Sequence, residues 1–219
     1  KERILFQSFW KINKLKSALL KQLPGIQIQY EMAPLYRQRP DIQTIEPQNF
    51  IKSAVMILLC KDENNEWFIP LTQRYKYEGH HSAQISLPGG KYEVLDGCLQ
   101  KTALRECNEE IGNIENILVL GKLTTIYIPI SGYMVEPYIG ICKEINPNFN
   151  IDVKEVKSLI KLSLTMLLDD GIVMHGIINN GSGNKIEAPY FKCKNHKIWG
   201  ATAMILNELK VIFKTEKLL

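Results

Sequence analysis

Apolar positions along the chain follow two different spacings, and these predict where helices and strands lie. Over residues 1–23 apolar side chains recur at three- and four-residue steps, which predicts an amphipathic helix that Pro24-Gly25 ends. Apolar runs at 51–60 and 67–73 flank the turn residues Asn64-Asn65 and predict a hairpin of buried strands. The first third of the chain therefore places one helix ahead of a hairpin.

Helices and strands interleave in the rest of the chain without a regular βαβ repeat. A helix is predicted up to about Ile111, where Gly112 ends it, and a last helix over about 199–215. Strands are predicted near 118–128, 134–142, 156–162, 172–178 and 186–193. This order favours an α/β fold with a mixed sheet and helices on both faces. We expect an N-terminal helix and connecting arm over residues 1–49 and the main domain over 50–219.

Lysines on the polar face of the N-terminal helix leave three placements for it. The helix can pack on the core of its own domain, lie on a membrane surface, or act as a targeting peptide. We favour packing on the core because the segment has few Arg and Ser residues. The longest apolar run, Ala54 to Cys60, falls far short of the roughly 18–20 residues of a transmembrane helix. We therefore expect no membrane partner.

Composition and charge narrow the class of protein. The 219 residues are 45% hydrophobic and 23% charged, which is typical of a globular protein. The net charge of +4 suits an anionic small-molecule ligand, and we expect no nucleic-acid partner. Five cysteines without a C-x-x-C pair argue against a disulfide framework or zinc ribbon, and predict a reducing, cytoplasmic location. A homodimer stays open.

The most informative segment is an acidic helix that reads R-E-C-N-E-E-I-G from Arg105 to Gly112. At about 100° per residue, Glu106, Glu109 and Glu110 fall on one arc of this helix. Carboxylates four residues apart repel each other, and a divalent cation would offset the cost. Hard oxygen ligands suit Mg²⁺ or Mn²⁺. The alternative is a solvated acidic helix face.

A glycine-containing turn upstream changes that balance in favour of a metal site. Leu87-Pro88-Gly89-Gly90 predicts a rigid turn, and a glycine carbonyl there can complete a metal shell. The turn and the helix together resemble the Nudix box, G-x5-E-x7-R-E-U-x-E-E-x-G-U, in which U is a bulky aliphatic residue. The matching residues are Gly90, Arg105, Glu106, Glu109, Glu110 and Gly112.

Two positions of the box, and one spacing within it, differ from that pattern. Cys107 and Asn113 stand where the pattern has aliphatic residues. Fourteen residues separate Gly90 from Arg105, one more than in the general box. The acid in the middle of the box is therefore Asp96 when counted from the glycine, or falls on Gly97 when counted back from the arginine.

The longer spacing is similar to that of one branch of the family, the coenzyme A diphosphatases. Matching segments upstream and downstream are Leu71-Thr72-Gln73-Arg74, His81, Gln84-Ile85, Leu87-Pro88-Gly89-Gly90 and Ile198-Trp199-Gly200-Ala201-Thr202-Ala203. Tyr75, Glu78, Ala83 and Leu87 depart from the branch pattern. The resemblance implies an α/β/α sandwich with a mixed sheet. It also implies metal-dependent hydrolysis of the diphosphate of coenzyme A, or of its derivatives, to 3′,5′-ADP and 4′-phosphopantetheine.

The same resemblance implies roles for individual residues. Glu106 and Glu110 would be the main ligands of Mg²⁺ or Mn²⁺, and Gly90 would add a carbonyl. Glu109 would be a further ligand or the base that activates water, and Arg105 would orient the carboxylates. Glu155 is a weaker alternative for the base.

Candidate substrate contacts lie upstream of the box. Arg74, His81 and Gln84 are the residues in question, with Arg74 the first candidate for the 3′-phosphate of coenzyme A and the scissile diphosphate its alternative. Other substrates stay open, namely ADP-ribose, NADH or a damaged nucleotide. A non-catalytic regulatory module with the same fold is the alternative to an enzyme.

Overall fold

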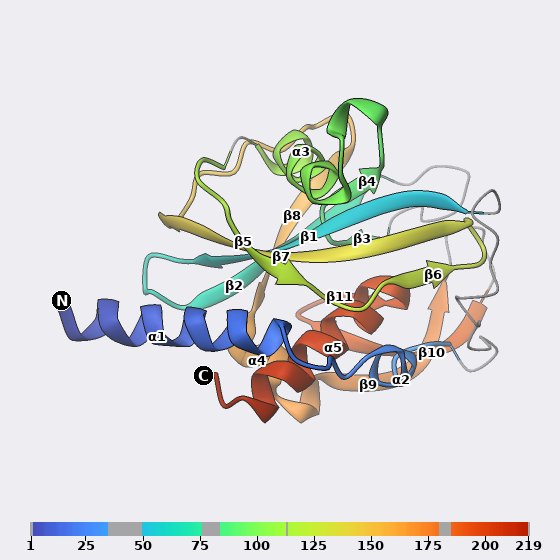
Figure 1. Ribbon diagram of the computed structural model, residues 1–219. Helices are drawn as coiled ribbons and strands as arrows, with labels where there is room; N and C mark the ends of the chain where they lie inside the picture. Colours follow the sequence, from blue (N-terminus) through green and yellow to red (C-terminus); the bar gives the residue numbers. More distant parts are fainter. Residues whose placement is uncertain (1, 35–49, 76–83, 113, 180–184, 219) are drawn as a thin grey trace.

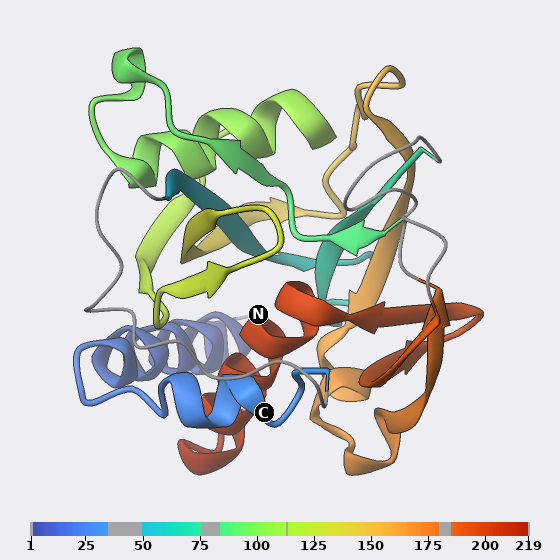
Figure 2. The same ribbon diagram turned by 90° about the vertical axis from the view of Figure 1, so that its right-hand side faces the viewer.

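The computed structural model describes residues 2–34, 50–75, 84–112, 114–179 and 185–218, with side chains from residue 11 onward. Two β-sheets and the helices around them make up these residues (Figures 1 and 2). No helix within them has the length and apolar character needed to cross a membrane.

The main sheet is mixed, as predicted. Its central strand β1 (Ile51–Lys61) pairs in parallel with β7 (Tyr133–Ile145) and antiparallel with β2 (Trp67–Arg74). The strand order is β3-β2-β1-β7-β5, while β4 pairs with β1, β6 with β7 and β8 with β2. The remaining strands are β3 (Ile85–Ser86), β4 (Gly89–Lys91), β5 (Leu118–Lys122), β6 (Ile126–Ile128) and β8 (Val156–Ser163). The single strand expected over 118–128 is thus two short strands.

A second sheet of three antiparallel strands lies beside the first. It consists of β9 (Val173–Asn179), β10 (Lys185–Cys193) and β11 (His196–Trp199), in the order β11-β10-β9. The apolar runs predicted β9 and β10, but periodicity carries no information on which sheet a strand joins. Strand β11 was not predicted, because its four residues are too few to show a period.

Helices cover both faces of the main sheet. Helix α3 (Leu99–Ile111) lies on one face, and α5 (Gly200–Thr215) and α1 (Glu2–Leu19) lie on the other (Figure 1). Two short helices, α2 (Ile26–Tyr30) and α4 (Leu164–Leu168), complete the α5 side. The predicted α/β architecture is therefore correct, with α3 alone on the face that carries the acidic segment.

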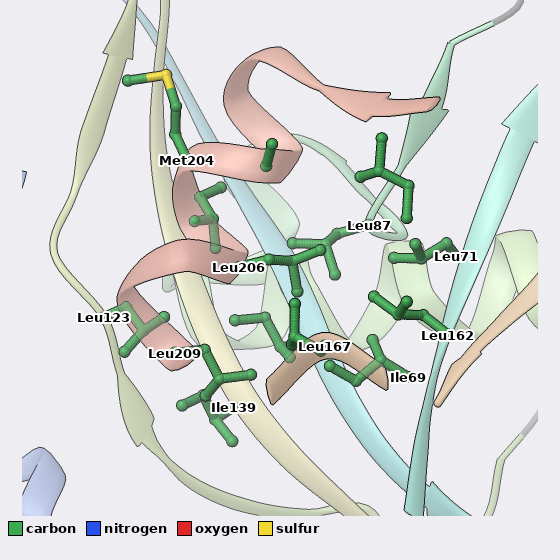
Figure 3. Close-up of a cluster of buried hydrophobic side chains, with 14 of the residues drawn as sticks. Ile69, Leu71, Leu87, Leu123, Ile139, Leu162, Leu167, Met204, Leu206 and Leu209 are labelled. Carbon is green, nitrogen blue, oxygen red and sulfur yellow. The ribbon is translucent and has the colours of Figure 1, made fainter. Parts of the chain in front are cut away.

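Apolar side chains of the sheet and of α5 form the larger core. Ile69 and Leu71 of β2, Ile139 of β7, and Leu206 and Leu209 of α5 are all fully buried there (Figure 3). A smaller core fills the space between the sheet and α3, with members Ala54, Met56, Leu58, Ala103, Cys107 and Ile111. Burial of this kind contributes about 25 cal/mol per Å² of apolar surface, so both faces hold the sheet rigid.

The N-terminal segment packs against the rest of its own chain. Leu15 and Leu19 of α1 are buried in the larger core. The carboxylate of Glu208 in α5 is fully buried and accepts hydrogen bonds from the Gly25 amide at 3.0 Å and Gln29 Nε2 at 2.8 Å. These contacts give α1 the placement on the core that its apolar face predicts.

Candidate active site

Gly89 and Gly90, predicted from the sequence to lie in a turn, begin the short strand β4, which pairs with β1 and lies next to helix α3. A Cβ on Gly89 would overlap the backbone of Val55 in β1. A Cβ on Gly90 would overlap the carboxylate of Glu106 in α3. The absence of a side chain at Gly89 lets β4 lie close to β1, and its absence at Gly90 lets β4 lie close to the acidic helix.

The three glutamates of α3 lie in three different environments. The side chain of Glu110 is 3% exposed, that of Glu106 is 16% exposed and that of Glu109 is 59% exposed. Cys107 and Ile111, on the neighbouring arc, face the core. The acidic arc therefore runs from the sheet to the solvent, and only its inner two members are largely withdrawn from water.

Arg105 binds the two outer glutamates. Its Nη1 donates to Glu106 Oε1 at 2.9 Å and to Glu109 Oε2 at 3.0 Å. Its Nη2 donates to the Lys91 carbonyl at 3.1 Å, which ties the helix to β4. The arginine therefore contacts both carboxylates and can hold their orientation.

Asp96 holds the other edge of the same guanidinium. Arg105 Nε donates to Asp96 Oδ1 at 2.8 Å and Nη2 donates to Oδ2 at 3.0 Å. Thr102 Oγ1 also donates to Oδ2, at 2.8 Å. The hydrogen bonds from Arg105 hold the pKa of Asp96 well below its usual range, although burial opposes them. Arg105 thus binds the acid that counting from the glycine gives, and Gly97, the position that counting back from the arginine gives, has a φ of 70°.

Residues of strands β2 and β4 bind the carboxylate of Glu110. Thr72 Oγ1 donates to Oε2 at 3.0 Å, Arg74 Nη2 lies 3.4 Å from Oε1, and the Gly89 amide donates to the carboxylate. Burial raises the pKa of Glu110 to about 7, although Arg74 and Thr72 act in the opposite direction. A carboxylate buried so deeply would gain from a further cation.

The segment between β7 and β8 closes the C-terminal end of α3. The amides of Asn150 and Asp152 donate to the carbonyls of Ile111 and Glu110, each at 3.1 Å. Burial raises the pKa of Glu106, and the nearby charges of Glu109 and Glu155 add to the rise. Glu155 therefore lies close enough to Glu106 to act on it electrostatically.

Of the predicted substrate contacts, Arg74 lies next to the acidic helix. Arg74, at the end of β2, touches Glu110, and its amide donates to the Gln84 carbonyl at 3.1 Å. His81 lies outside the described residues. Thr72 was not singled out from the sequence, although it stands two residues before Arg74, where alternation puts both on one face of β2.

The donor set suits a hard divalent cation. Glu106 and Glu110 offer carboxylate oxygens, and Gly90 lies against Glu106 in a space that a Cβ would fill. Among the described residues no three His, Cys, Asp or Glu side chains gather into a ligand cluster, and Glu109 is bound by Arg105 at 3.0 Å. The candidate ligands for a divalent cation are therefore the carboxylates of Glu106 and Glu110 and the backbone of Gly90 in β4.

Comparison with known proteins agrees with this geometry. The NUDIX domain model matches residues 51–145. The chain is 31% identical over 164 residues to "Uncharacterized Nudix hydrolase NudL" of Yersinia pestis (strain Pestoides F), covering 72% of this chain and 77% of that protein. The protein of the same name from Yersinia pseudotuberculosis serotype O:1b matches equally well.

Solved structures show the same fold. A MutT/nudix family protein from Enterococcus faecalis has a TM-score of 0.50 at 18% identity, covering 78% of this chain and 63% of its own. The M. Smegmatis Nudix hydrolase RenU has a TM-score of 0.50 at 14% identity, covering 75% and 86%. Identity to the Yersinia relatives, together with the box built by α3 and its turn, places this chain in the Nudix hydrolase family. It is a pyrophosphohydrolase, and enzymes of this family generally use divalent metal ions.

Proposed function

We propose that the enzyme hydrolyses the diphosphate of coenzyme A or its derivatives, with 3′,5′-ADP and 4′-phosphopantetheine as products. The observation that carries this proposal is the contact between two separate motifs. Thr72 and Arg74 belong to the upstream segment that resembles the coenzyme A branch, and both bind Glu110 of the box helix. The branch-specific segment and the general hydrolytic helix therefore form one site.

In this proposal Glu106 and Glu110 hold Mg²⁺ or Mn²⁺, and the Gly90 carbonyl adds an oxygen. When bound, such an ion neutralises phosphate oxygens and lowers the pKa of coordinated water. Glu110 contributes a carboxylate that Thr72 holds in one orientation. A ligand held this way needs little rearrangement when the ion binds.

The more exposed residues of the site are the candidates for the base that removes the proton of the attacking water. Glu109 is exposed, and Arg105 Nη1 donates to its Oε2 at 3.0 Å. We assign Glu109 as a further ligand or as the base that removes the proton. Glu155 is the alternative base, since its charge already acts on Glu106.

Arg74 is the first substrate contact in this proposal, and its position favours the scissile diphosphate. Its guanidinium lies 3.4 Å from a glutamate of the metal site, where the bond to be broken must sit. Gln84 and His81 remain candidate substrate contacts from the same stretch of chain. Arg74→Ala should therefore lower kcat/KM for coenzyme A and for dephospho-coenzyme A alike. A loss confined to coenzyme A would assign Arg74 to the 3′-phosphate.

All five cysteines are free thiols in the structure. This agrees with the reducing, cytoplasmic location that we propose. The partner in this proposal is the small-molecule substrate, and a homodimer remains open.

A substrate panel tests the proposal. Purified enzyme is incubated with coenzyme A, acetyl-coenzyme A, NADH, ADP-ribose and nucleoside triphosphates, each with Mg²⁺ or Mn²⁺, and the products are separated by chromatography. We expect 3′,5′-ADP and 4′-phosphopantetheine, no product in excess chelator, and restored turnover when metal is returned. Preference for NADH, ADP-ribose or a nucleotide would replace coenzyme A as substrate. Turnover in excess chelator would contradict the metal mechanism.

A further inference from the structure

The two carboxylate oxygens of Glu110 have partners of different kinds. Oε2 accepts from the hydroxyl of Thr72 at 3.0 Å, and Thr72 is fully buried. Oε1 faces the guanidinium of Arg74 at 3.4 Å, and the side chain of Arg74 is 34% exposed. The Gly89 amide also donates to this carboxylate. Oε2 therefore accepts from a neutral group inside the protein, whereas Oε1 lies next to a cation that is partly exposed to solvent.

The contact with Arg74 is also the weaker kind of arginine pair. Arg105 holds Asp96 through two parallel bonds of 2.8 and 3.0 Å. Arg74 reaches Glu110 through a single nitrogen at 3.4 Å. Two-point pairs are the strong form for this side chain, and a single long contact is much easier to give up.

Charge explains why the contact exists. Arg105 forms ion pairs with Glu106, Glu109 and Asp96. Glu110 is more deeply buried than the other two glutamates, and Arg74 is the cation that touches it. A divalent cation bound between Glu106 and Glu110 would take over this charge compensation, and the guanidinium would then lie free beside a bound phosphate.

We propose that Arg74 and a divalent cation compete for Oε1 of Glu110, and that the displaced guanidinium then binds a phosphate of the substrate. Thr72 keeps Oε2 in place during the exchange, so that only one oxygen changes its partner. The second half of this inference rests on the proposed function. The competition itself does not, because it concerns metal binding alone.

Calorimetric titration with Mn²⁺ alone, at pH 8 and without substrate, tests the competition. Arg74→Met removes the competing cation and should tighten the Mn²⁺ dissociation constant about 2- to 5-fold, the range of a partly exposed ion pair. Lys101→Met is the matched control, since Lys101 is exposed on α3, the helix that carries Glu110, and the charge change is equal. Its dissociation constant should stay near that of the wild type. Unchanged or weaker Mn²⁺ binding by Arg74→Met would overturn the competition.

Arg74→Lys keeps the test decisive if the methionine variant does not fold. Lysine retains the charge but lacks the planar guanidinium, so a smaller tightening is expected, and none would contradict the proposal. Binding of the displaced Arg74 guanidinium to a substrate phosphate is tested separately, by measuring the KM for coenzyme A at saturating Mn²⁺. It should rise in Arg74→Met, and an unchanged KM would overturn that half. If coenzyme A is not the substrate, the Mn²⁺ titration still decides the competition.

Discussion

Asp96 and Arg105 form a two-point ion pair, with Nε on Oδ1 at 2.8 Å and Nη2 on Oδ2 at 3.0 Å. Asp96 ends the short 3-10 helix η3 (Val94–Asp96), and the Glu93 amide donates to its Oδ2 at 3.0 Å. The pair therefore ties the loop before α3 to the middle of that helix. It leaves Nη1 of the arginine to hold the two outer glutamates.

Removing the Asp96 charge should destabilise the protein. Asp96→Asn leaves a partly buried Arg105 without its two-point partner, and we expect a loss of about 2–4 kcal/mol in the free energy of unfolding. Urea denaturation measures it. Asp170→Asn is the control, because Asp170 is 80% exposed in its pairs with Lys210 and Lys214 and should change stability far less than Asp96→Asn does. Equal losses in the two variants would contradict the role given to Asp96.

Glu110→Gln should keep the fold and lose the activity. The change is nearly isosteric but replaces a charged ligand by a neutral one, so turnover should fall by on the order of 10²-fold or more. Circular dichroism checks the fold, and steady-state kinetics at saturating metal gives kcat. Glu144→Gln, an exposed residue of β7, serves as the control and should keep full activity. Near wild-type turnover of Glu110→Gln would remove Glu110 from the metal site.

The pKa of Glu110, about 7, sets how metal-free stability depends on pH. The folded protein holds this proton more tightly than the unfolded chain, in which the ordinary value is 4.5. Stability from this group is therefore full below about pH 4.5 and falls as pH rises through about 7, by about 3 kcal/mol in all.

Unfolding in excess chelator at pH 5 and pH 8 measures this effect. Wild type should lose stability relative to Glu110→Gln between the two values, because glutamine has no proton to lose. A constant difference between the two proteins would show that Glu110 titrates at an ordinary pKa. A difference of the opposite sign would show that its charged form is the favoured one.

Thr72 should act through the orientation of Glu110. Thr72→Val keeps the shape but removes the hydroxyl that donates to Oε2, and a lost outer hydrogen bond of this kind weakens metal binding about 10-fold or more. Thr72→Ser restores the hydroxyl and should recover most of the affinity. Mn²⁺ titration measures both. Equal weakening in the two variants would assign the effect to packing. The expected sign is opposite to that of Arg74→Met.

Much of the fold follows from local features of the sequence. The helix over 99–111 and the strands β1, β2 and β7 lie within a few residues of their predicted bounds, because apolar periodicity is a property of neighbouring positions. The acidic arc of α3 also follows from the sequence, because the helical repeat of about 100° per residue is enough to place the three glutamates on one face.

Contacts between distant segments account for what was missed. Counting along the chain places the acid of the box at Asp96 or at Gly97, depending on the starting residue. Only the structure shows that Arg105, nine residues after Asp96, binds Asp96. The second sheet forms because β10 pairs with β9 on one side and with β11 on the other, while none of the three pairs with the main sheet in the described residues.

The sequence by itself determined the family, the hydrolytic helix and its three acids. Only the tertiary structure decided how these acids differ, because burial depends on what packs against each side of α3. Glu110 faces Thr72, which lies 38 residues away on β2, and is buried with a raised pKa, while Glu109 faces water. Desolvation is a property of the assembled site, so no spacing along the chain could assign it to one glutamate.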